Sequence, residues 1–295
     1  MQVLWVFAHP EPRSLNGRLR EEGLAALAEA GHDAESSDLY AMDWKPAVDA
    51  SDFADPPGRL RVPAASERAH RCGRLHADIR AEQAKLDRAD AVVFQFPLWW
   101  YGMPAILKGW FDRVFVQGYA YGIPDPDDPG RSLRYGRGPL AGKRALVVLT
   151  TGSPGAALGP RGINGQLDHV LFPLLHGTLW YVGLSVLPPV AITGADRLDA
   201  DGYARAAARV RQRVRTIPDT PPLPFRTQSG GDYDENLVLR PHLVPGVTGL
   251  EAHYGPQRTL SAGCPDGTAA STHRGGGPTA NCDDRPGPGS RRGPR

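Results

Sequence analysis

Continuous apolar runs mark this chain at wide intervals. Four of them cover residues 2–7, 91–96, 144–151 and 184–190. A short apolar run without polar alternation is typical of a strand buried on both faces, as in a parallel sheet. The segment 33–39 is more polar, so we expect a second strand nearer the edge of the same sheet.

Between these runs, apolar residues recur at helical spacing. Ile106, Trp110 and Val114 lie four residues apart, and Pro104 stands where a first helical turn opens. The predicted helices cover 16–30, 66–88, 104–116, 164–182 and 200–215. Pro173 should kink the fourth of them. Because strand and helix alternate, the pattern predicts an α/β fold, a doubly wound five-stranded parallel sheet of order 2-1-3-4-5 with helices on both faces.

A change of composition divides the chain near Pro218, where several prolines follow one another. Residues 1–217 form the expected domain. Residues 218–255 still hold apolar side chains, so we expect an arm that packs on this body or on a partner subunit. Residues 256–295 consist mostly of Gly, Pro, Ser and Arg, and we expect them to be disordered.

Composition excludes several classes of protein. A net charge of +2 gives no footprint for nucleic acid. The three cysteines show neither a metal-ligand spacing nor a disulfide framework, so we expect no metal and a reducing, cytoplasmic location. The apolar run at 2–8 is too short for a signal peptide, and no run reaches membrane-spanning length.

The loop after the third strand is the first place where chemistry is expected. Pro97 ends the strand, and Trp99, Trp100 and Tyr101 follow before Gly102. Ligands of open α/β sheets bind outside the carboxyl ends of the strands. A loop of this composition suits a flat aromatic cofactor, although the three aromatic side chains could instead pack on a neighbouring subunit.

The loops after the first and fourth strands carry polar groups. Ser14 and Asn16 open the first helix, where unpaired N–H groups and the helix dipole favour phosphate. The alternative is that both merely cap the helix. The chain has no G-x-G-x-x-G and no Walker motif. After the fourth strand, Thr150, Thr151 and the backbone N–H groups of 152–155 can hydrogen-bond the polar edge of an isoalloxazine.

Residues 94–115, FQFPLWWYGMPAILKGWFDRVF, resemble the signature of the NAD(P)H:quinone oxidoreductases of the DT-diaphorase type. The resemblance extends from about residue 1 to about residue 225. It implies a flavodoxin-like fold, an FAD cofactor, a homodimer, and two-electron hydride transfer from NAD(P)H through the flavin to a quinone.

The resemblance also assigns site residues. The residues that it places at the flavin are His9, Ser14, Leu15, Asn16, Pro97, Leu98, Trp99, Trp100, Tyr101, Thr150, Thr151, Gly152, Ser153 and Gly155. It favours Tyr121 and Tyr181 as walls of the substrate slot, where exposed loop packing and core packing are the alternatives. Arg205 matches an arginine at the FAD adenine, or else belongs to a solvated basic face.

Two positions depart from the family. Leu158 and Asn164 stand where mammalian members carry a Tyr and a His that are credited with stabilising charge on the flavin. Leucine donates no hydrogen bond, and an amide does not change charge near pH 7. We therefore expect Asn164 and the backbone N–H groups at Gly152 and Gly155 to take the catalytic part.

Two rival functions remain open on the same fold. One is an FMN-dependent azo- or nitroreductase. The other is a flavin-binding regulatory subunit of a potassium efflux system, a reading that the loss of the Tyr and His makes less remote. The sequence leaves open the acceptor and the choice between NADH and NADPH.

Overall fold

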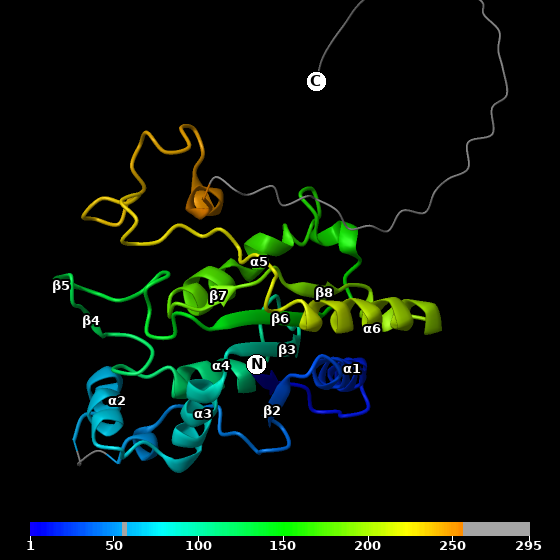
Figure 1. Ribbon diagram of the computed structural model, residues 1–295, viewed down its shortest axis with the longest axis horizontal. Coiled ribbons are helices and arrows are strands. Elements are labelled where there is room, and N and C mark those ends of the chain that lie inside the picture. The colour runs from blue at the N-terminus through cyan, green and yellow to red at the C-terminus, as the bar shows by residue number, and fades with distance from the viewer. Residues whose placement is uncertain (55–57, 256–295) are drawn as a thin grey trace, which may run out of the picture. The chain divides into compact units, whose positions relative to one another are not determined.

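The computed structural model describes residues 1–54 and 58–255 (Figure 1). Its main sheet consists of β1 (Gln2–Phe7), β2 (Asp33–Asp38), β3 (Ala91–Pro97), β6 (Arg144–Thr150), β7 (Ser185–Val186) and β8 (Val190–Ile192). The parallel strand order is β2-β1-β3-β6-β7, and β8 also pairs with β6. The predicted order 2-1-3-4-5 is therefore confirmed.

The fifth strand is split into two pieces. Leu187 still donates its N–H to the carbonyl of Ala145, but Pro188 and Pro189 follow. Proline has no N–H to offer the ladder. The single strand expected over 184–190 is thus wrong in detail, and pairing with β6 resumes only at Val190.

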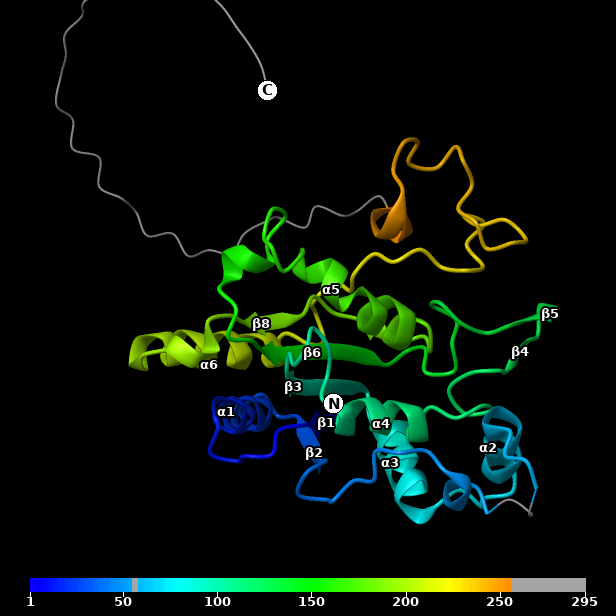
Figure 2. The ribbon, with the colours of Figure 1, turned by 180° about the vertical axis from the view of Figure 1, so that it is seen from behind.

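Helices cover both faces of the sheet. They are α1 (Leu15–Glu29), α2 (Val62–Arg71), α3 (Ala77–Arg88), α4 (Ala105–Val114), α5 (Leu167–Leu174), the π-helix Leu175–Trp180 and α6 (Ala200–Arg215). Short 3₁₀ helices lie at Ala50–Asp52, Gly155–Leu158, Ala195–Arg197 and Gly249–His253. In both ribbon views α1 and α6 lie on one side of the sheet and α3 and α4 on the other (Figures 1 and 2).

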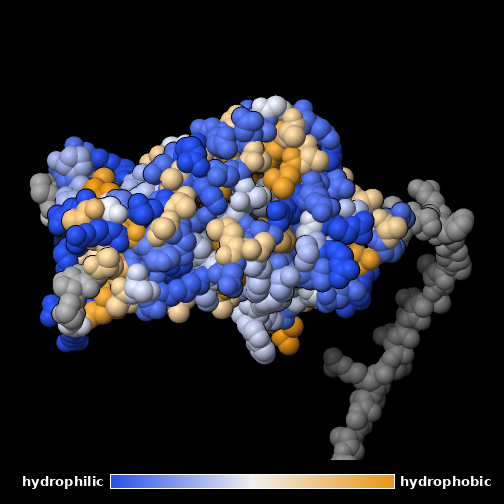
Figure 3. All heavy atoms as spheres, turned by 90° about the horizontal axis from the view of Figure 1, so that it is seen from below, coloured by the Kyte–Doolittle hydropathy of each residue, from blue (hydrophilic) through white to orange (hydrophobic). Residues whose placement is uncertain are grey.

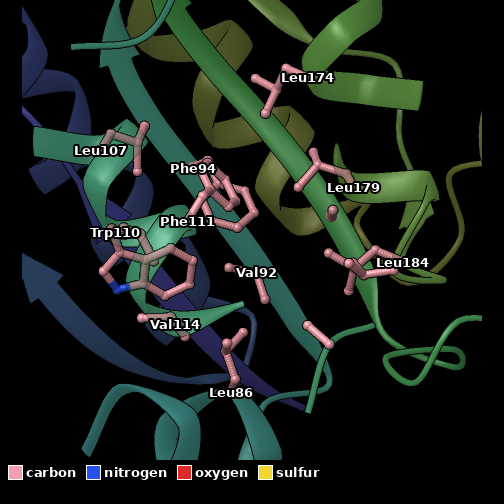
Figure 4. Packing of buried hydrophobic residues seen from close by; sticks show 14 of the residues in the cluster. Leu86, Val92, Phe94, Leu107, Trp110, Phe111, Val114, Leu174, Leu179 and Leu184 are labelled. Carbon is pink, nitrogen blue, oxygen red and sulfur yellow. The ribbon is translucent and has the colours of Figure 1, made fainter. Parts of the chain in front are cut away.

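The core has two halves because successive strand residues point to opposite faces. On β1, Trp5 packs with α1 and α6, whereas Leu4 and Val6 pack with the helices of the other face. Figure 4 shows Phe94 of β3 meeting Trp110 and Phe111 of α4 in that second half. Outside the core, the face in Figure 3 carries apolar atoms in several small groups among hydrophilic ones.

The helix expected over 66–88 is two helices. Gly73 has a left-handed backbone, with φ of +64°, and it follows the C-cap residue Cys72 where α2 ends. The N–H of Gly73 bonds the carbonyl of His70, and the N–H of Arg74 bonds that of Ala69, a typical C-terminal cap. The single helix expected over 66–88 is wrong because this glycine stops the helix inside a stretch of helical periodicity.

The segment that follows β2 lies partly in the interior. Asp52 and Phe53 are buried, and the buried Arg113 of α4 holds Asp52 at 2.9 Å. Lys45 reaches the same carboxylate at 3.1 Å. The segment is therefore tied to α4 by charge pairs that no local pattern reveals.

The segment between α4 and β6 contains a hairpin of β4 (Pro124–Asp125) and β5 (Asp128–Ser132). The helix expected over 164–182 begins only at Leu167 and continues as a π-helix after Pro173, so Asn164 lies in the preceding loop. The predicted kink is realised as a change of helix type near the proline.

The arm after Pro218 contacts the body at several points. Leu223 donates to the carbonyl of Val186 of β7, and Glu251 lies 2.8 Å from His169 of α5. Both ribbon views show this yellow-to-orange segment running past α5 (Figures 1 and 2). The expected disorder of 256–295 lies outside the described residues. Among the residues that are described, no helix is long and apolar enough to cross a membrane.

Candidate active site

Three loops begin side by side at the carboxyl edge of the sheet. The N–H of Ala8 bonds the carbonyl of Gln95, and the N–H of Leu98 bonds that of Thr150. The loops after β1, β3 and β6 therefore leave the sheet next to one another. The flavin positions expected from the sequence on these three loops are brought together at one edge.

The loop after β1 leaves backbone donors at the start of α1. Ser14 is the N-cap, and its hydroxyl accepts from the N–H of Gly17 at 3.2 Å. The first-turn N–H groups of Leu15 and Asn16 have no partner inside the helix, which suits an anion. A Cβ at Gly17 would lie 1.7 Å from the carbonyl oxygen of Pro12, so only glycine permits this close approach.

Arg13 adds little net positive charge to this loop. Its guanidinium pairs with Glu11 at 3.1 Å, and both side chains are largely exposed. The hydrogen bonds from Arg13 lower the pKa of Glu11, so the pair is charged on both sides and nearly neutral in sum. The positive potential of this loop therefore comes chiefly from the helix N-terminus.

A chain of buried polar groups connects the sheet to this loop. Trp5 donates its indole N–H to Gln95 at 3.0 Å, and the Gln95 amide donates to the carbonyl of Asn16 at 2.7 Å. The Asn16 amide then donates to the hydroxyl of Thr150 at 2.8 Å. Gln95, the polar residue of the otherwise apolar strand β3, thus links β1 to the start of α1.

The side-chain oxygen of Asn16 has no hydrogen-bond donor among the residues that the structure describes. The side chain is 4% exposed, and its Oδ1 is buried without a hydrogen-bond partner. A buried acceptor of this kind costs free energy unless something donates to it. The hydroxyl groups of a ribityl chain are donors of that type, so the chemistry of this position fits a flavin.

The aromatic loop after β3 is a tight turn. Trp99 and Gly102 exchange both backbone hydrogen bonds, at 3.0 and 2.9 Å. The two central residues, Trp100 and Tyr101, have φ of 50° and 58°, as a type I′ turn requires. Left-handed geometry is costly for such residues and persists where the surroundings enforce it.

The turn holds its aromatic side chains outward. Trp100 is 98% exposed, and Trp99 and Tyr101 are about half exposed. The ring of Trp99 lies 6.3 Å from that of His9, so residues expected at the flavin from two loops meet here. Large exposed aromatic side chains on a turn with strained backbone form a surface that suits a ligand or a second subunit.

The loop after β6 folds back on itself. Ser153 donates its N–H to the Thr151 hydroxyl at 3.3 Å, and Asn164 donates its amide to the Ser153 hydroxyl at 2.9 Å. A Cβ at Gly152 would lie 2.2 Å from the carboxylate of Asp196. Gly155 begins a short 3₁₀ helix.

The two positions that depart from the family have different surroundings. Leu158 is buried, at 5% exposed, at the end of that 3₁₀ helix. Asn164 stays in the loop, tied to Ser153 through its side chain and to the carbonyl of Ala157 through its backbone N–H. Asn164 is thus held next to the Thr/Gly segment.

A cavity of about 390 Å³ extends from the β1–α1 loop to the start of α6. The lining residues are Arg13, Leu15, Arg18, Ala195, Leu198, Asp199, Ala200 and Tyr203. The guanidinium of Arg18 lies 3.7 Å above the ring of Tyr203. Arg205 is exposed on α6 and does not line this cavity. Sequence reasoning missed Arg18, although it lies one helical turn after Ser14.

Tyr121 and Tyr181 lie at the other edge of the sheet. Tyr119 donates its hydroxyl to Asp87, just before β3, and the carbonyl of Tyr181 accepts from the N–H of Tyr135. Burial, followed by the nearby Tyr181, raises the pKa of Tyr121, so these two side chains are neighbours. Seven-residue strands such as β6 separate them from the flavin loops by about 20 Å.

Comparison with known proteins identifies the family. Residues 1–214 match the flavodoxin-like fold family. A putative quinone reductase from Klebsiella pneumoniae is 48% identical, with a TM-score of 0.84 over 86% of this chain and 100% of that one. NAD(P)H dehydrogenase [quinone] 1 from Rattus norvegicus is 36% identical over 231 residues, 77% of this chain and 81% of the relative. This chain belongs to the NAD(P)H:quinone oxidoreductase family.

A fungal relative is also similar. The ribosyldihydronicotinamide dehydrogenase-like protein traD from Penicillium crustosum is 44% identical over 257 residues, which are 86% of this chain and 92% of the relative. The alignment therefore extends beyond the flavodoxin-like body. The resemblance expected from residues 94–115 is confirmed, and by homology the chain is an oxidoreductase of the NAD(P)H dehydrogenase (quinone) type.

Proposed function

We propose that this family member is an FAD-dependent NAD(P)H:quinone reductase that transfers two electrons together. The observation that carries the proposal is Asn16, buried where the three loops meet, with one amide oxygen left for a donor. A bound flavin supplies the two-electron carrier between NAD(P)H and the acceptor, because hydride chemistry belongs to the cofactor.

Different residues would hold the different parts of a bound flavin. The N–H groups of Leu15 and Asn16 bind phosphate, and the Asn16 oxygen accepts from the ribityl chain. Thr150, Thr151 and the backbone of the following loop face the polar edge of the ring system. The outward turn at Trp99 would place its aromatic side chains beside the ring system.

Charge on the ring is stabilised without a proton relay. Leu158 offers no donor, and the Asn164 amide donates but does not titrate near pH 7. The backbone N–H groups from Gly152 to Gly155 are fixed dipoles that need no reorganisation during the reaction. This arrangement supports turnover while leaving its rate below that of a relay-equipped enzyme.

The 390 Å³ cavity supports FAD over FMN. It continues from the phosphate loop, and Tyr203 and Arg18 give it a flat, cationic wall. An adenosine half fits such a wall by stacking, whereas FMN ends at its phosphate and leaves the cavity empty. Placement of Arg205 at the adenine stays a prediction.

A second copy of the chain completes each active site. Tyr121 and Tyr181 lie across the sheet from the flavin loops of their own chain, so in the proposed enzyme they line the slot over the partner's flavin. The exposed aromatic turn at Trp100 suits burial in such an interface. The homodimer follows from this geometry as part of the proposal.

The test begins with purified protein. We expect a flavin spectrum, FAD as the released flavin, bleaching on anaerobic addition of NADPH, and reoxidation by a simple benzoquinone. Released FMN would instead support the azo- or nitroreductase. A bound flavin that stays oxidised would favour the regulatory subunit, which Leu158 and Asn164 keep in contention. Failure to bind either flavin on reconstitution would contradict all three functions.

A further inference from the structure

A second cavity, of about 410 Å³, lies between the end of α5, the segment before β6 and the arm. Its lining residues are Arg134, Tyr135, Phe172, Pro173, His176, Gly177, Arg226, Gln228, Tyr233, Leu237 and His253. The volume is within the usual range for small-molecule sites. Sequence reasoning missed it, although His176 interrupts an apolar segment of the expected fourth helix.

Flat rings form the walls of this cavity. His176 stacks on Phe172 at 4.6 Å and on Tyr135 at 5.0 Å, and Tyr233 stacks on His253 at 6.0 Å. His176 is held in the π-helix, a rare form that occurs frequently at functional sites. Parallel, half-buried rings on two sides suit a planar aromatic ligand.

The imidazoles carry no charge near neutral pH. Burial, and then the neighbouring His253, lower the pKa of His176 to about 4. Burial, and then Arg226, also lower the pKa of His253. Both rings are therefore neutral stacking surfaces under ordinary conditions.

One guanidinium in the cavity has no acidic counterpart. Arg226 is paired with Asp232 at 2.6 Å, so its charge is balanced. Arg134 instead donates its Nε to the amide oxygen of the buried Gln228 at 2.5 Å. Within residues 1–54 and 58–255, no carboxylate lies within ion-pair distance of Arg134, which leaves its charge for a ligand.

The cavity borders the proposed substrate slot. Tyr135, which lines the cavity, meets Tyr181 edge-on at 5.1 Å and donates its N–H to the Tyr181 carbonyl at 3.0 Å. Tyr181 in turn neighbours Tyr121. The cavity therefore adjoins, through Tyr135, the residues that we assign to the acceptor.

We propose that this cavity is the outer part of the acceptor site, and that it selects planar quinones that bear a carboxylate or sulfonate group. The ring system lies among Tyr135, His176 and Tyr233, and the anionic group meets Arg134. The catalytic part of this inference rests on the proposed function, whereas binding of an aromatic acid to the cavity does not.

The binding test uses a ligand that cannot be reduced. In calorimetry with the whole protein, 2-naphthoate should bind. 2-Naphthalenemethanol should bind at least tenfold more weakly, because it lacks the charged group whose hydrogen bond contributes about tenfold in affinity. Arg134→Gln should abolish the difference, and Arg134→Lys should restore part of it. Arg131→Gln is the matched control, since Arg131 lies on β5, three residues before Arg134, and pairs with Asp128.

The kinetic test compares two acceptors in the same variants. Anthraquinone-2-sulfonate should show a KM raised about tenfold in Arg134→Gln, with the KM for neutral menadione unchanged. Equal effects on both acceptors would contradict the selectivity. If naphthoate binds at Arg134 but no quinone is reduced, the proposed function fails and the cavity assignment stands. If quinones are reduced but the affinity for naphthoate is the same in wild type and Arg134→Gln, the inference is overturned.

Discussion

At the scale of single residues, Asn16 determines how the site is connected. It joins two loops that are 134 residues apart through its bond to Thr150, and it is itself held by Gln95. A buried amide oxygen without a donor costs free energy, which a donor on a bound ligand would offset. In the proposed enzyme, the residue therefore couples the fold of the sheet edge to occupancy of the flavin site.

Replacement of Asn16 should weaken flavin binding. In Asn16→Leu, both the donor to Thr150 and the acceptor for the ribityl chain are lost, so we expect the flavin Kd to rise about tenfold or more. Fluorescence of the flavin released on dilution measures this. Asn236→Ala, on the exposed part of the arm, is the control, and an equal change in the two variants would contradict the role of Asn16.

Gly17 should be intolerant of even one methyl group. Its φ is not left-handed, so the cost of Gly17→Ala is the clash with the carbonyl of Pro12 alone. Overpacking of this kind costs about 1–3 kcal/mol, and displacement of the loop should lower flavin content. Thermal unfolding checks it against Gly177→Ala, where the added Cβ meets nothing within 4 Å.

At the scale of elements, buried charges rather than apolar contacts fasten the segment after β2. Arg113 of α4 is 1% exposed and binds both Asp52 and Asp78, each at 2.9 Å. Such a group binds its partners strongly only when all are present, because each charge alone is costly to bury. Helix α4 thereby follows the aromatic turn at one end and, through Arg113, holds Lys45 and Asp52 at the other.

Loss of Arg113 should destabilise the protein and weaken the dependence of its stability on acidic pH. Arg113→Met leaves Asp52 partly uncompensated, with a cost of about 3–5 kcal/mol. For Asp78, burial acts to raise the pKa, but hydrogen bonds from Arg113 and His76 outweigh it and lower the pKa. The wild-type protein should thus lose stability as the pH falls below 3.8, and the variant should lose less. Urea unfolding at several pH values measures both effects.

The π-helix should confer a second acid sensitivity. The pKa of His176 is about 4 in the folded chain and near 6.5 when exposed, so the unfolded state binds the proton more readily. Stability should therefore be complete above pH 6.5 and decline as the pH falls toward 4. His176→Phe keeps the stack but removes the proton, and its unfolding midpoint should change less across that range. An identical slope in both proteins would contradict the assignment.

At the scale of the whole molecule, the sheet separates two halves of the proposed site. The loops with Asn16, Trp99 and Thr150 lie at the carboxyl ends of the strands, and Tyr121 and Tyr181 lie at the other ends. A distance of about 20 Å is beyond the reach of any side chain. The proposed enzyme works only if two chains exchange these halves.

Mixed dimers should show this exchange directly. Asn16→Leu disables the flavin half and Tyr121→Ala disables the slot half of separate chains. In a dimer of one of each, one site combines two intact halves, so random mixing should recover roughly a quarter of wild-type activity. Each variant dimer alone is the control. No recovery on unfolding and refolding the two together would show that each chain builds its own site.

Local pattern was enough for the framework of this protein. Continuous apolar runs can be buried only in a sheet covered on both faces, so the five strands, their parallel order and the helices α1, α4 and α6 follow from composition and spacing. The long motif at 94–115 likewise identified the family, and strand ends located the three loops. Each of these depends on residues close together in the chain.

Tertiary structure alone decided the rest, because the interactions join residues far apart in the chain. Arg113 reaches Asp52 across 61 positions, and Trp180 bonds the carbonyl of Arg226 across 46. The cavity around His176 likewise exists only because residues of the arm close one side of it. The sequence by itself determined which edge of the sheet carries the predicted flavin loops. The folded chain determined that the other half of the proposed site lies at the opposite edge.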